Sequence, residues 1–167
     1  FAGHPGKKMA KVYDLSKDVT RQFFEANSNP EILRGSDQVV ELMEKCLSNR
    51  ELGFHGLSKI MAKDYYTYTH SINVGIYCMS FGLKMGLSGE DVHELGLGGM
   101  LHDVGKSVAP KEILNKQGSL TDAEFEVIKE HTFDGEKILR DLGCYGEKVV
   151  QMAGQHHERY CGGGYHQ

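Results

Sequence analysis

The chain lacks several features that would assign it to a particular class of protein. Its four cysteines, Cys46, Cys78, Cys144 and Cys161, form no C-x-x-C pair, which is typical of reduced thiols in a cytoplasmic protein. No apolar run approaches the roughly 20 residues of a membrane span, and no signal peptide is visible. A net charge of -4 argues against binding to long nucleic acid, which needs clustered positive charge. We therefore expect a cytoplasmic protein without a membrane span.

Strand patterns are scarce, whereas helical periodicity and helix caps recur along the chain. The first predicted helix covers Met9–Phe24, has the apolar stripe Val12, Leu15, Val19 and Phe23, and is stopped by Asn27–Pro30. The second is capped by Ser36, is ended by Gly53, and carries the apolar residues Val39, Val40, Met43, Cys46 and Leu47. A third helix is predicted to begin at Leu57. A longer helix is predicted from about Thr67 to Met85, and capping boxes at Ser88–Asp91 and Thr121–Glu124 open two more. The fold class is predicted to be all-α.

Five histidines and one aspartate are spaced about one helix and one turn apart, in the order His70, His102–Asp103, His131 and His156–His157. Imidazole nitrogen and carboxylate oxygen suit divalent metals such as iron, zinc and manganese. Six groups exceed the three protein ligands that a single catalytic zinc ion typically takes. A pair of ions bridged by Asp103 would use them all. The pattern indicates a two-metal hydrolase.

The positions of these residues on the predicted helices indicate that their side chains face the protein interior. His70 shares an apolar stripe with Val74, Tyr77 and Phe81, and His131 shares one with Ile128, Gly135, Ile138 and Leu142. His102 and Asp103 are predicted in the last turn of a helix that Gly105 ends. His156 and His157 close a helix that carries Val149, Val150 and Ala153. Gly96, Gly98, Gly99 and Gly135 remove side-chain bulk near these positions. A single histidine on such a stripe is more often an ordinary core residue. Burying all six groups without a compensating partner is costly, which favours a shared metal centre.

A resemblance to a known family rests on several motifs in order. The segment Leu101–Lys106, sequence LHDVGK, resembles the core signature of the HD superfamily of metal-dependent phosphohydrolases. The further motifs are Tyr66–Val74, Pro110–Leu114, Leu120–Thr121 with Glu124 and His131, His156–Arg159, and Gly162–Tyr165. Together they are similar to the HD-GYP domain, a family of bacterial cyclic di-GMP phosphodiesterases usually attached to sensor or receiver modules.

The resemblance covers about residues 57–167 and implies roles for single residues. His70, His102 and Asp103 would hold one metal ion, and Asp103 would bridge to a second ion held by His131, His156 and His157. Lys106 would reach the scissile phosphate, and Arg159 and Tyr165 are expected on the substrate side. Asp103 and Lys106 are the expected catalytic residues. Iron is the first choice for both ions, with manganese as the alternative.

The implied activity is hydrolysis of cyclic di-GMP to pGpG, GMP or both, with a bridging hydroxide as the nucleophile. One alternative is a weak or inactive member that binds nucleotide or a protein partner in signalling. Another is an HD phosphohydrolase acting on a different nucleotide. The implied partners are a sensor or receiver module and diguanylate cyclase domains.

Residues ahead of the HD-GYP-like part are given their own interpretation. Because the chain opens on Phe1 and not on Met, residues 1–8 are expected to be a tag or disordered. Residues 9–56 are predicted to form a helical segment, whose apolar stripes fit a signalling linker, a homodimer face or simple packing. Packing is the default.

The sequence departs from the HD-GYP pattern in three places. Cys161 stands where the pattern has Asp and His166 where it has Pro, so the glycine run between them is expected to be mobile. Tyr66 stands where members with three metals carry glutamate, which predicts two ions. A further aspartate ligand is expected on a later helix beyond Gln167, which leaves the domain incomplete at its C-terminal end.

Overall fold

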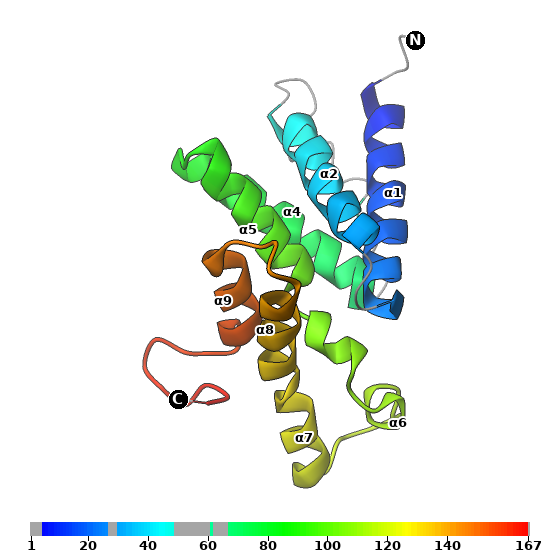
Figure 1. Ribbon diagram of the computed structural model, residues 1–167, viewed down its shortest axis with the longest axis vertical. Helices are drawn as coiled ribbons and strands as arrows, with labels where there is room; N and C mark the ends of the chain where they lie inside the picture. The colour runs from blue at the N-terminus through cyan, green and yellow to red at the C-terminus, as the bar shows by residue number, and fades with distance from the viewer. Residues whose placement is uncertain (1–4, 27–29, 49–60, 62–66, 167) are drawn as a thin grey trace. The chain divides into compact units, whose positions relative to one another are not determined.

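The computed structural model describes residues 5–26, 30–48, 61 and 67–166. Every regular element among these residues is a helix, which confirms the all-α prediction (Figure 1). The elements are α1 (Pro5–Ala26), α2 (Pro30–Leu47), α4 (Thr67–Met85), α5 (Gly89–Leu101), the short 3-10 helix η1 (Val104–Ser107), α6 (Lys111–Leu114), α7 (Asp122–Lys129), α8 (His131–Leu142) and α9 (Glu147–Gln155). None of the described helices is long and apolar enough to cross a membrane.

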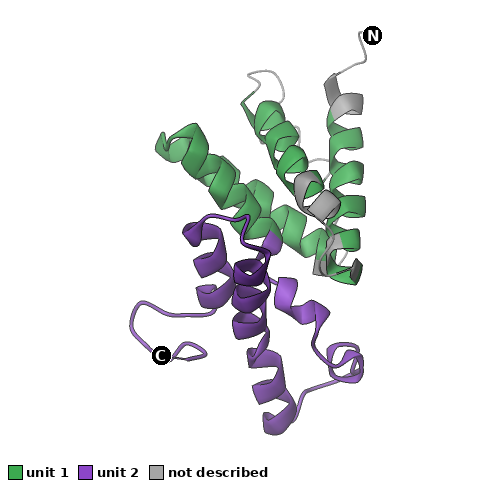
Figure 2. Cartoon of the chain, in the orientation of Figure 1, with its two compact units in different colours: residues 1–100 green, residues 101–167 purple. Residues whose placement is uncertain are grey.

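The chain forms two compact units, Phe1–Met100 and Leu101–Gln167 (Figure 2). In the first unit, α1 packs against α2 and α4. The predicted core stripe of α2 is confirmed, because Val39, Val40, Met43, Cys46 and Leu47 are all buried. The expected end at Gly53, the helix from Leu57 and the metal-count argument at Tyr66 lie outside the described residues.

Two predictions for the N-terminal helices are wrong. The buried face of α1 includes Ser16 and Thr20, whereas Leu15 of the predicted stripe is 46% exposed. Ser36 does not cap α2, since it lies inside this helix and is fully buried. Both errors arise because small side chains with hydroxyl groups, namely Ser16, Thr20 and Ser36, are buried on the two helices α1 and α2, which pack against each other. Ser16 meets its hydrogen-bonding need locally by donating to the Val12 carbonyl oxygen at 2.6 Å, so it can be buried.

Glycines allow α4 and α5 to approach closely within the first unit. A Cβ atom on Gly75 would lie 2.8 Å from Met100 Cγ, and one on Gly99 would lie 2.7 Å from the Cα atom of Gly75. Met79 occupies the space beside Gly96 in the same way, because a Cβ atom on Gly96 would lie 2.8 Å from Met79 Cγ. The prediction that these glycines remove bulk for a neighbouring helix is therefore confirmed at Gly96 and Gly99.

The bounds of α4 agree with the prediction, but its buried face does not. Ile72, Ile76 and Met79 are fully buried, whereas Tyr77 and Phe81 of the predicted stripe are 55% and 63% exposed. The helix is apolar on several sides, so periodicity alone did not distinguish the face that packs.

In the second unit, α8 packs against η1 and α9. The contact depends on Gly105, where a Cβ atom would overlap the carbonyl oxygen of His131 on α8. Gly135 lies opposite, and a Cβ atom added there would be 3.3 Å from the Gly105 nitrogen and 3.5 Å from Ala153 Cβ. Gly135 thus makes room for two neighbours, as the sequence predicts. The buried residues of α8 are His131, Thr132, Gly135 and Leu139, so the predicted stripe is correct at His131 and Gly135 and wrong at Ile138 and Leu142, which are only half-buried.

Candidate metal centre

The HD signature lies in a turn. The sequence places His102 and Asp103 in the last turn of a helix, but α5 ends at Leu101 and η1 begins at Val104. The helix therefore ends one residue before His102, which is a correction to the prediction. Both side chains are buried, with Asp103 only 1% exposed and His102 6% exposed.

The carboxylate of Asp103 has a different environment at each oxygen. Its Oδ2 accepts a hydrogen bond from Lys106 Nζ at 2.7 Å and lies 3.3 Å from His102 Nε2. Its Oδ1 lies 3.3 Å from His131 Nε2 and 3.5 Å from His156 Nε2. Three imidazoles and one ammonium group thus surround one buried carboxylate.

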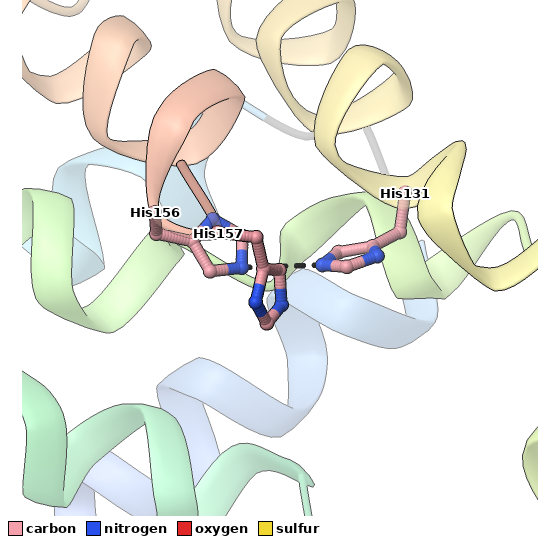
Figure 3. Close-up of side chains that lie close together, drawn as sticks. All are labelled: His131, His156 and His157. Carbon is pink, nitrogen blue, oxygen red and sulfur yellow. Dashed lines mark hydrogen bonds between the residues drawn. The ribbon is translucent and has the colours of Figure 1, made fainter. Parts of the chain in front are cut away.

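The backbone fixes which nitrogens of His131 and His156 point into the centre. His131 Nδ1 donates to the Ile128 carbonyl oxygen at 2.5 Å, and His156 Nδ1 donates to the Ala153 carbonyl oxygen at 3.0 Å. Each neutral ring then has a bare Nε2 lone pair. These two Nε2 atoms lie 3.2 Å apart, facing each other (Figure 3).

The donor set fits a bound cation. Asp103 Oδ1 is buried and accepts no hydrogen bond within the described residues, although two imidazole nitrogens approach it. Two lone pairs and a carboxylate oxygen in contact are stable only with a positive charge between them, supplied by a proton or by a metal ion. A donated Nδ1–H is also the usual way in which a metal-binding histidine is oriented.

The protonation states suit metal binding. Burial alone would raise the pKa of the Asp103 carboxyl, but His102, His131 and His156, when they carry a proton on the nitrogen that faces it, outweigh burial and hold the pKa well below its usual range. Burial, with smaller contributions from His156 and His131, lowers the pKa of His157 to about 4. Asp103 is therefore ionised and His157 neutral at pH 7, which are the forms that bind metal.

His157 completes a group of three histidines. Ligand atoms of His131, His156 and His157 all lie within 4.8 Å of one another, and the three rings converge in Figure 3. The adjacent pair comes from the end of α9, where His156 is the C-cap residue. The predicted placement after Val149, Val150 and Ala153 is confirmed, since all three are buried on α9.

A pocket of about 400 Å3 opens beside this group. Its walls are residues of α7 and of the segment after α9, namely Phe125, Lys129, His156, His157, Glu158, Arg159, Gly163, Gly164 and Tyr165. Arg159 and Tyr165, the two residues expected on the substrate side, both belong to this wall. The volume falls in the range of about 300–1,000 Å3 that is usual for small-molecule sites.

Sequence reasoning missed Phe125 and Lys129 as pocket residues. They stand one turn apart on α7, with Lys129 Nζ 5.2 Å from the Phe125 ring centroid and 5.9 Å from the Tyr165 centroid. Their spacing of four residues places them on one helix face, and this was the available signal. A ring next to a cation suits a ligand with a planar base and a phosphate.

Comparison with known proteins agrees with this geometry. A family model described as HD domain matches residues 41–167. The chain belongs to the HD domain family. The resemblance to HD-GYP phosphodiesterases that the motifs predict is confirmed by the curated relatives, which are cyclic dinucleotide phosphodiesterases by name.

Two curated relatives are phosphodiesterases of cyclic dinucleotides by name. The chain is 39% identical over 109 residues to a cyclic di-GMP phosphodiesterase of Pseudomonas aeruginosa, which covers 65% of this chain and 26% of that protein. It is also 39% identical over 105 residues to the 3'3'-cGAMP-specific phosphodiesterase 1 of Vibrio cholerae, covering 62% of this chain and 24% of that protein. The HD domain thus spans about a quarter of the length of these relatives.

A solved structure shares the fold. Bd1817, an HDG"Y"P protein of Bdellovibrio bacteriovorus, superposes with a TM-score of 0.82 over 98% of this chain and 54% of that chain. The sequence identity is 18%, so this likeness supports the helical HD fold alone.

The remaining predicted ligand of the HD domain is His70. It lies on α4 in the first unit, and its side chain is exposed. The expectation that its stripe faces the core is wrong, and its role as a metal ligand stays a prediction from the sequence.

Proposed function

We propose that this HD domain is the catalytic part of a bacterial phosphodiesterase that hydrolyses cyclic di-GMP with a pair of metal ions. The observation that carries the proposal is the meeting of His131 Nε2, His156 Nε2 and Asp103 Oδ1 in a buried site, where Oδ1 accepts no hydrogen bond from any described residue. The names of the two curated relatives support the substrate class.

The proposed metal ligands fall into two sets, one at each carboxylate oxygen of Asp103. His131, His156 and His157 would hold one ion together with Oδ1, and His102 with Oδ2 and His70 would hold the other. When bound, the ions supply Lewis acidity to the phosphate oxygens and activate the attacking water. Iron is the first candidate and manganese the second, because histidine and carboxylate serve both.

The protein's own groups supply position and charge. Lys106 Nζ is 2.7 Å from Asp103 Oδ2 and 26% exposed, so it can hold the carboxylate and still face a phosphate. An ammonium at that place stabilises negative charge that develops on the phosphate oxygens. Lys129 and Arg159 add two further cations at the pocket.

The pocket suits one half of a cyclic dinucleotide. Phe125 and Tyr165 meet edge to face with their centroids 5.8 Å apart, and Tyr165 stacks on His157. Such rings offer a surface for a planar base, while the cations attract the phosphate beside it. The product is pGpG after one cleavage and GMP after two.

One relative favours a second substrate. The cGAMP-specific phosphodiesterase of Vibrio cholerae is as similar in sequence as the cyclic di-GMP enzyme. Cyclic dinucleotides that carry one adenine share the same phosphodiester ring, so the metal centre would cleave either. The choice between them depends on contacts with the base edges.

The test is product formation by the full-length protein loaded with Mn2+ or Fe2+, given cyclic di-GMP and 3'3'-cGAMP separately. We expect turnover of cyclic di-GMP that is lost in Asp103→Asn and in His131→Ala. The matched control is His93→Ala, which removes a histidine that pairs with Asp37 on α2, 2.8 Å away, and leaves the metal ligands intact.

The other outcomes decide between the functional classes. Tight binding of cyclic di-GMP without turnover in the metal-loaded protein would show a binding module instead of an enzyme. Cleavage of 3'3'-cGAMP alone would assign the other substrate. The sensor or receiver module, the diguanylate cyclase partner and a homodimer through α1 and α2 remain proposals for the full-length protein.

A further inference from the structure

The loop after α9 is fastened at its end by His166. The His166 backbone N–H donates to Glu158 Oε1 at 3.0 Å, and its ring packs against Phe133 with centroids 3.9 Å apart. His166 Nε2 lies 2.7 Å from Thr132 Oγ1. The one hydroxyl hydrogen of Thr132 goes to the Lys129 carbonyl oxygen at 3.0 Å, so His166 Nε2 is the donor in this pair.

The glycine run meets Glu158 at Gly164. Gly162 and Gly163 have φ angles of 79° and 75°, in the left-handed region that favours glycine. A Cβ atom on Gly164 would lie 2.7 Å from the backbone Cα atom of Glu158, so only glycine allows the loop this close. In the structure the loop follows a path fixed at Gly164 and His166 by Glu158, and its mobility stays a prediction from the sequence.

This path places Tyr165 on a metal ligand. Tyr165 lies between Gly164 and His166, and its ring stacks on the His157 imidazole with centroids 4.1 Å apart and an angle of 16° between the planes. The edge of the Tyr165 ring also meets Phe125 on α7. Tyr165 is thus held between α7 and His157.

His157 needs such support more than its neighbours do. His131 and His156 each donate Nδ1–H to a backbone carbonyl oxygen, which fixes the ring. In the part of the chain that the structure describes, no hydrogen bond to either nitrogen of His157 is present. The orientation of His157 is therefore restrained by ring contacts, namely the stack on Tyr165 and the tilted contact with His156, whose centroid is 4.3 Å away.

We propose that Glu158 and His166 are positioning residues that hold Tyr165 against His157 and so orient this imidazole for metal binding. The inference rests on the proposed function, since it takes His157 as a ligand. His166 stands where the HD-GYP pattern has proline, which has no N–H to donate. In this chain a hydrogen bond to Glu158 and another to Thr132 take the place of a rigid ring.

The test uses two pairs of variants in the full-length protein. Glu158→Ala removes the acceptor for the His166 N–H, whereas Glu158→Gln keeps an acceptor oxygen at the same distance from the backbone. Thr132→Val removes the hydroxyl group with little change of shape, whereas Thr132→Ser keeps it. Calorimetric titration with Mn2+ should show about tenfold weaker binding of one ion in Glu158→Ala and Thr132→Val, and near-normal binding in Glu158→Gln and Thr132→Ser.

Coupling to Tyr165 separates positioning from general stability. If Glu158 acts through the Tyr165 ring, the double variant Glu158→Ala with Tyr165→Leu binds Mn2+ no more weakly than Tyr165→Leu alone. Additive losses in the double variant would overturn the proposal.

A metal-free measurement keeps the proposal distinct from the proposed function. With selectively labelled histidine and tyrosine, nuclear Overhauser contacts between the Tyr165 and His157 rings should be present in the wild type and Glu158→Gln, and absent in Glu158→Ala. Contacts that persist in Glu158→Ala would overturn the positioning role. Failure of the wild type to bind either Mn2+ or Fe2+ would instead overturn the proposed function, while the ring contacts still decide the positioning role.

Discussion

The Nε2 atoms of His131 and His156 face each other at 3.2 Å, although each ring donates its Nδ1–H to a backbone carbonyl oxygen. In neutral rings of this tautomer both facing nitrogens are bare, and Asp103 Oδ1 lies beside them without a hydrogen bond among the described residues. A cation between these three atoms satisfies all of them. A single proton can pair with only some of them at a time.

Metal ions should therefore stabilise the folded protein. At a free concentration one hundred times the dissociation constant, one bound ion adds about 2.7 kcal/mol to the free energy of unfolding. We expect Mn2+ to raise the melting temperature of the wild type and a chelator to reverse the change. His131→Ala should lose most of this response, whereas His93→Ala should keep it. An equal response in both variants would show that the ions bind elsewhere.

Gly105 should tolerate no larger residue. A Cβ atom there would overlap the His131 carbonyl oxygen, which belongs to backbone and cannot move aside alone. We expect Gly105→Ala to lower the free energy of unfolding by about 1–3 kcal/mol and to weaken metal binding, since η1 and α8 must separate. Gly89→Ala is the matched control, because its Cβ atom would have only Glu44 Oε1 nearby, at 3.8 Å. Chemical denaturation of the metal-free variants measures the difference.

Lys106 should affect turnover more than metal binding. Its ammonium group contacts Asp103 Oδ2 but is not a metal ligand. We expect Lys106→Met to lower kcat by about 100-fold or more, in line with the loss of one group that stabilises developing charge, while the metal content stays nearly unchanged. Loss of both ions along with activity would instead give Lys106 a structural role at Asp103.

The capping box at the start of α7 gives a pH-dependent prediction. The Lys116 ammonium, followed by the N–H and hydroxyl groups of Thr121, lowers the pKa of Glu124 from 4.5 to about 2. Because the folded-state pKa is depressed, the resulting stability is fully present above pH 4.5 and is lost as the pH falls through 2. Carbon-detected titration of Glu124 should give a pKa near 2 in the wild type and a higher value in Thr121→Ala.

The same cap should contribute to stability at neutral pH. Glu124 N–H donates to Thr121 Oγ1 at 3.3 Å, and Thr121 N–H donates to Glu124 Oε2 at 2.7 Å. We expect Thr121→Ala to cost about 1 kcal/mol and Thr121→Ser to be nearly neutral, as measured by denaturation. Equal stability of the two variants would contradict the capping assignment.

Local signals in the sequence predicted much of the fold. The box at Thr121 and Glu124 forms as expected, and Ser88 caps α5 by accepting from the Asp91 N–H at 3.1 Å. The limits of α4 at Thr67 and Met85 also agree. These features depend on residues a few positions apart, so the sequence records them directly.

Buried faces were predicted less well, because they depend on which helices meet. Ser16, Thr20 and Ser36 are buried where helices pack closely, while the apolar Tyr77 and Phe81 are exposed. The periodicity of apolar residues predicts that the hydroxyl residues are exposed and the aromatic ones buried, which is the reverse of the structure. The helix limit at Leu101 was missed for a related reason, since Gly105 serves a close approach to α8 and not the end of α5.

The candidate ligands of the second unit were predicted from the chemistry of their side chains. His102, Asp103, His131, His156 and His157 come together as expected, but nothing in their spacing revealed the bonds to the Ile128 and Ala153 carbonyl oxygens that orient two of the rings. The role of His166 at the end of the glycine loop was also hidden. Its contacts with Glu158 and Thr132 depend on the path of the chain.

The most direct test of the metal centre is anomalous diffraction at the manganese edge from crystals of the full-length protein grown with Mn2+. We predict an anomalous peak roughly 2.0–2.3 Å from Asp103 Oδ1, His131 Nε2 and His156 Nε2, at metal–ligand distances. Metal-loaded crystals with no peak between these three atoms would contradict the account.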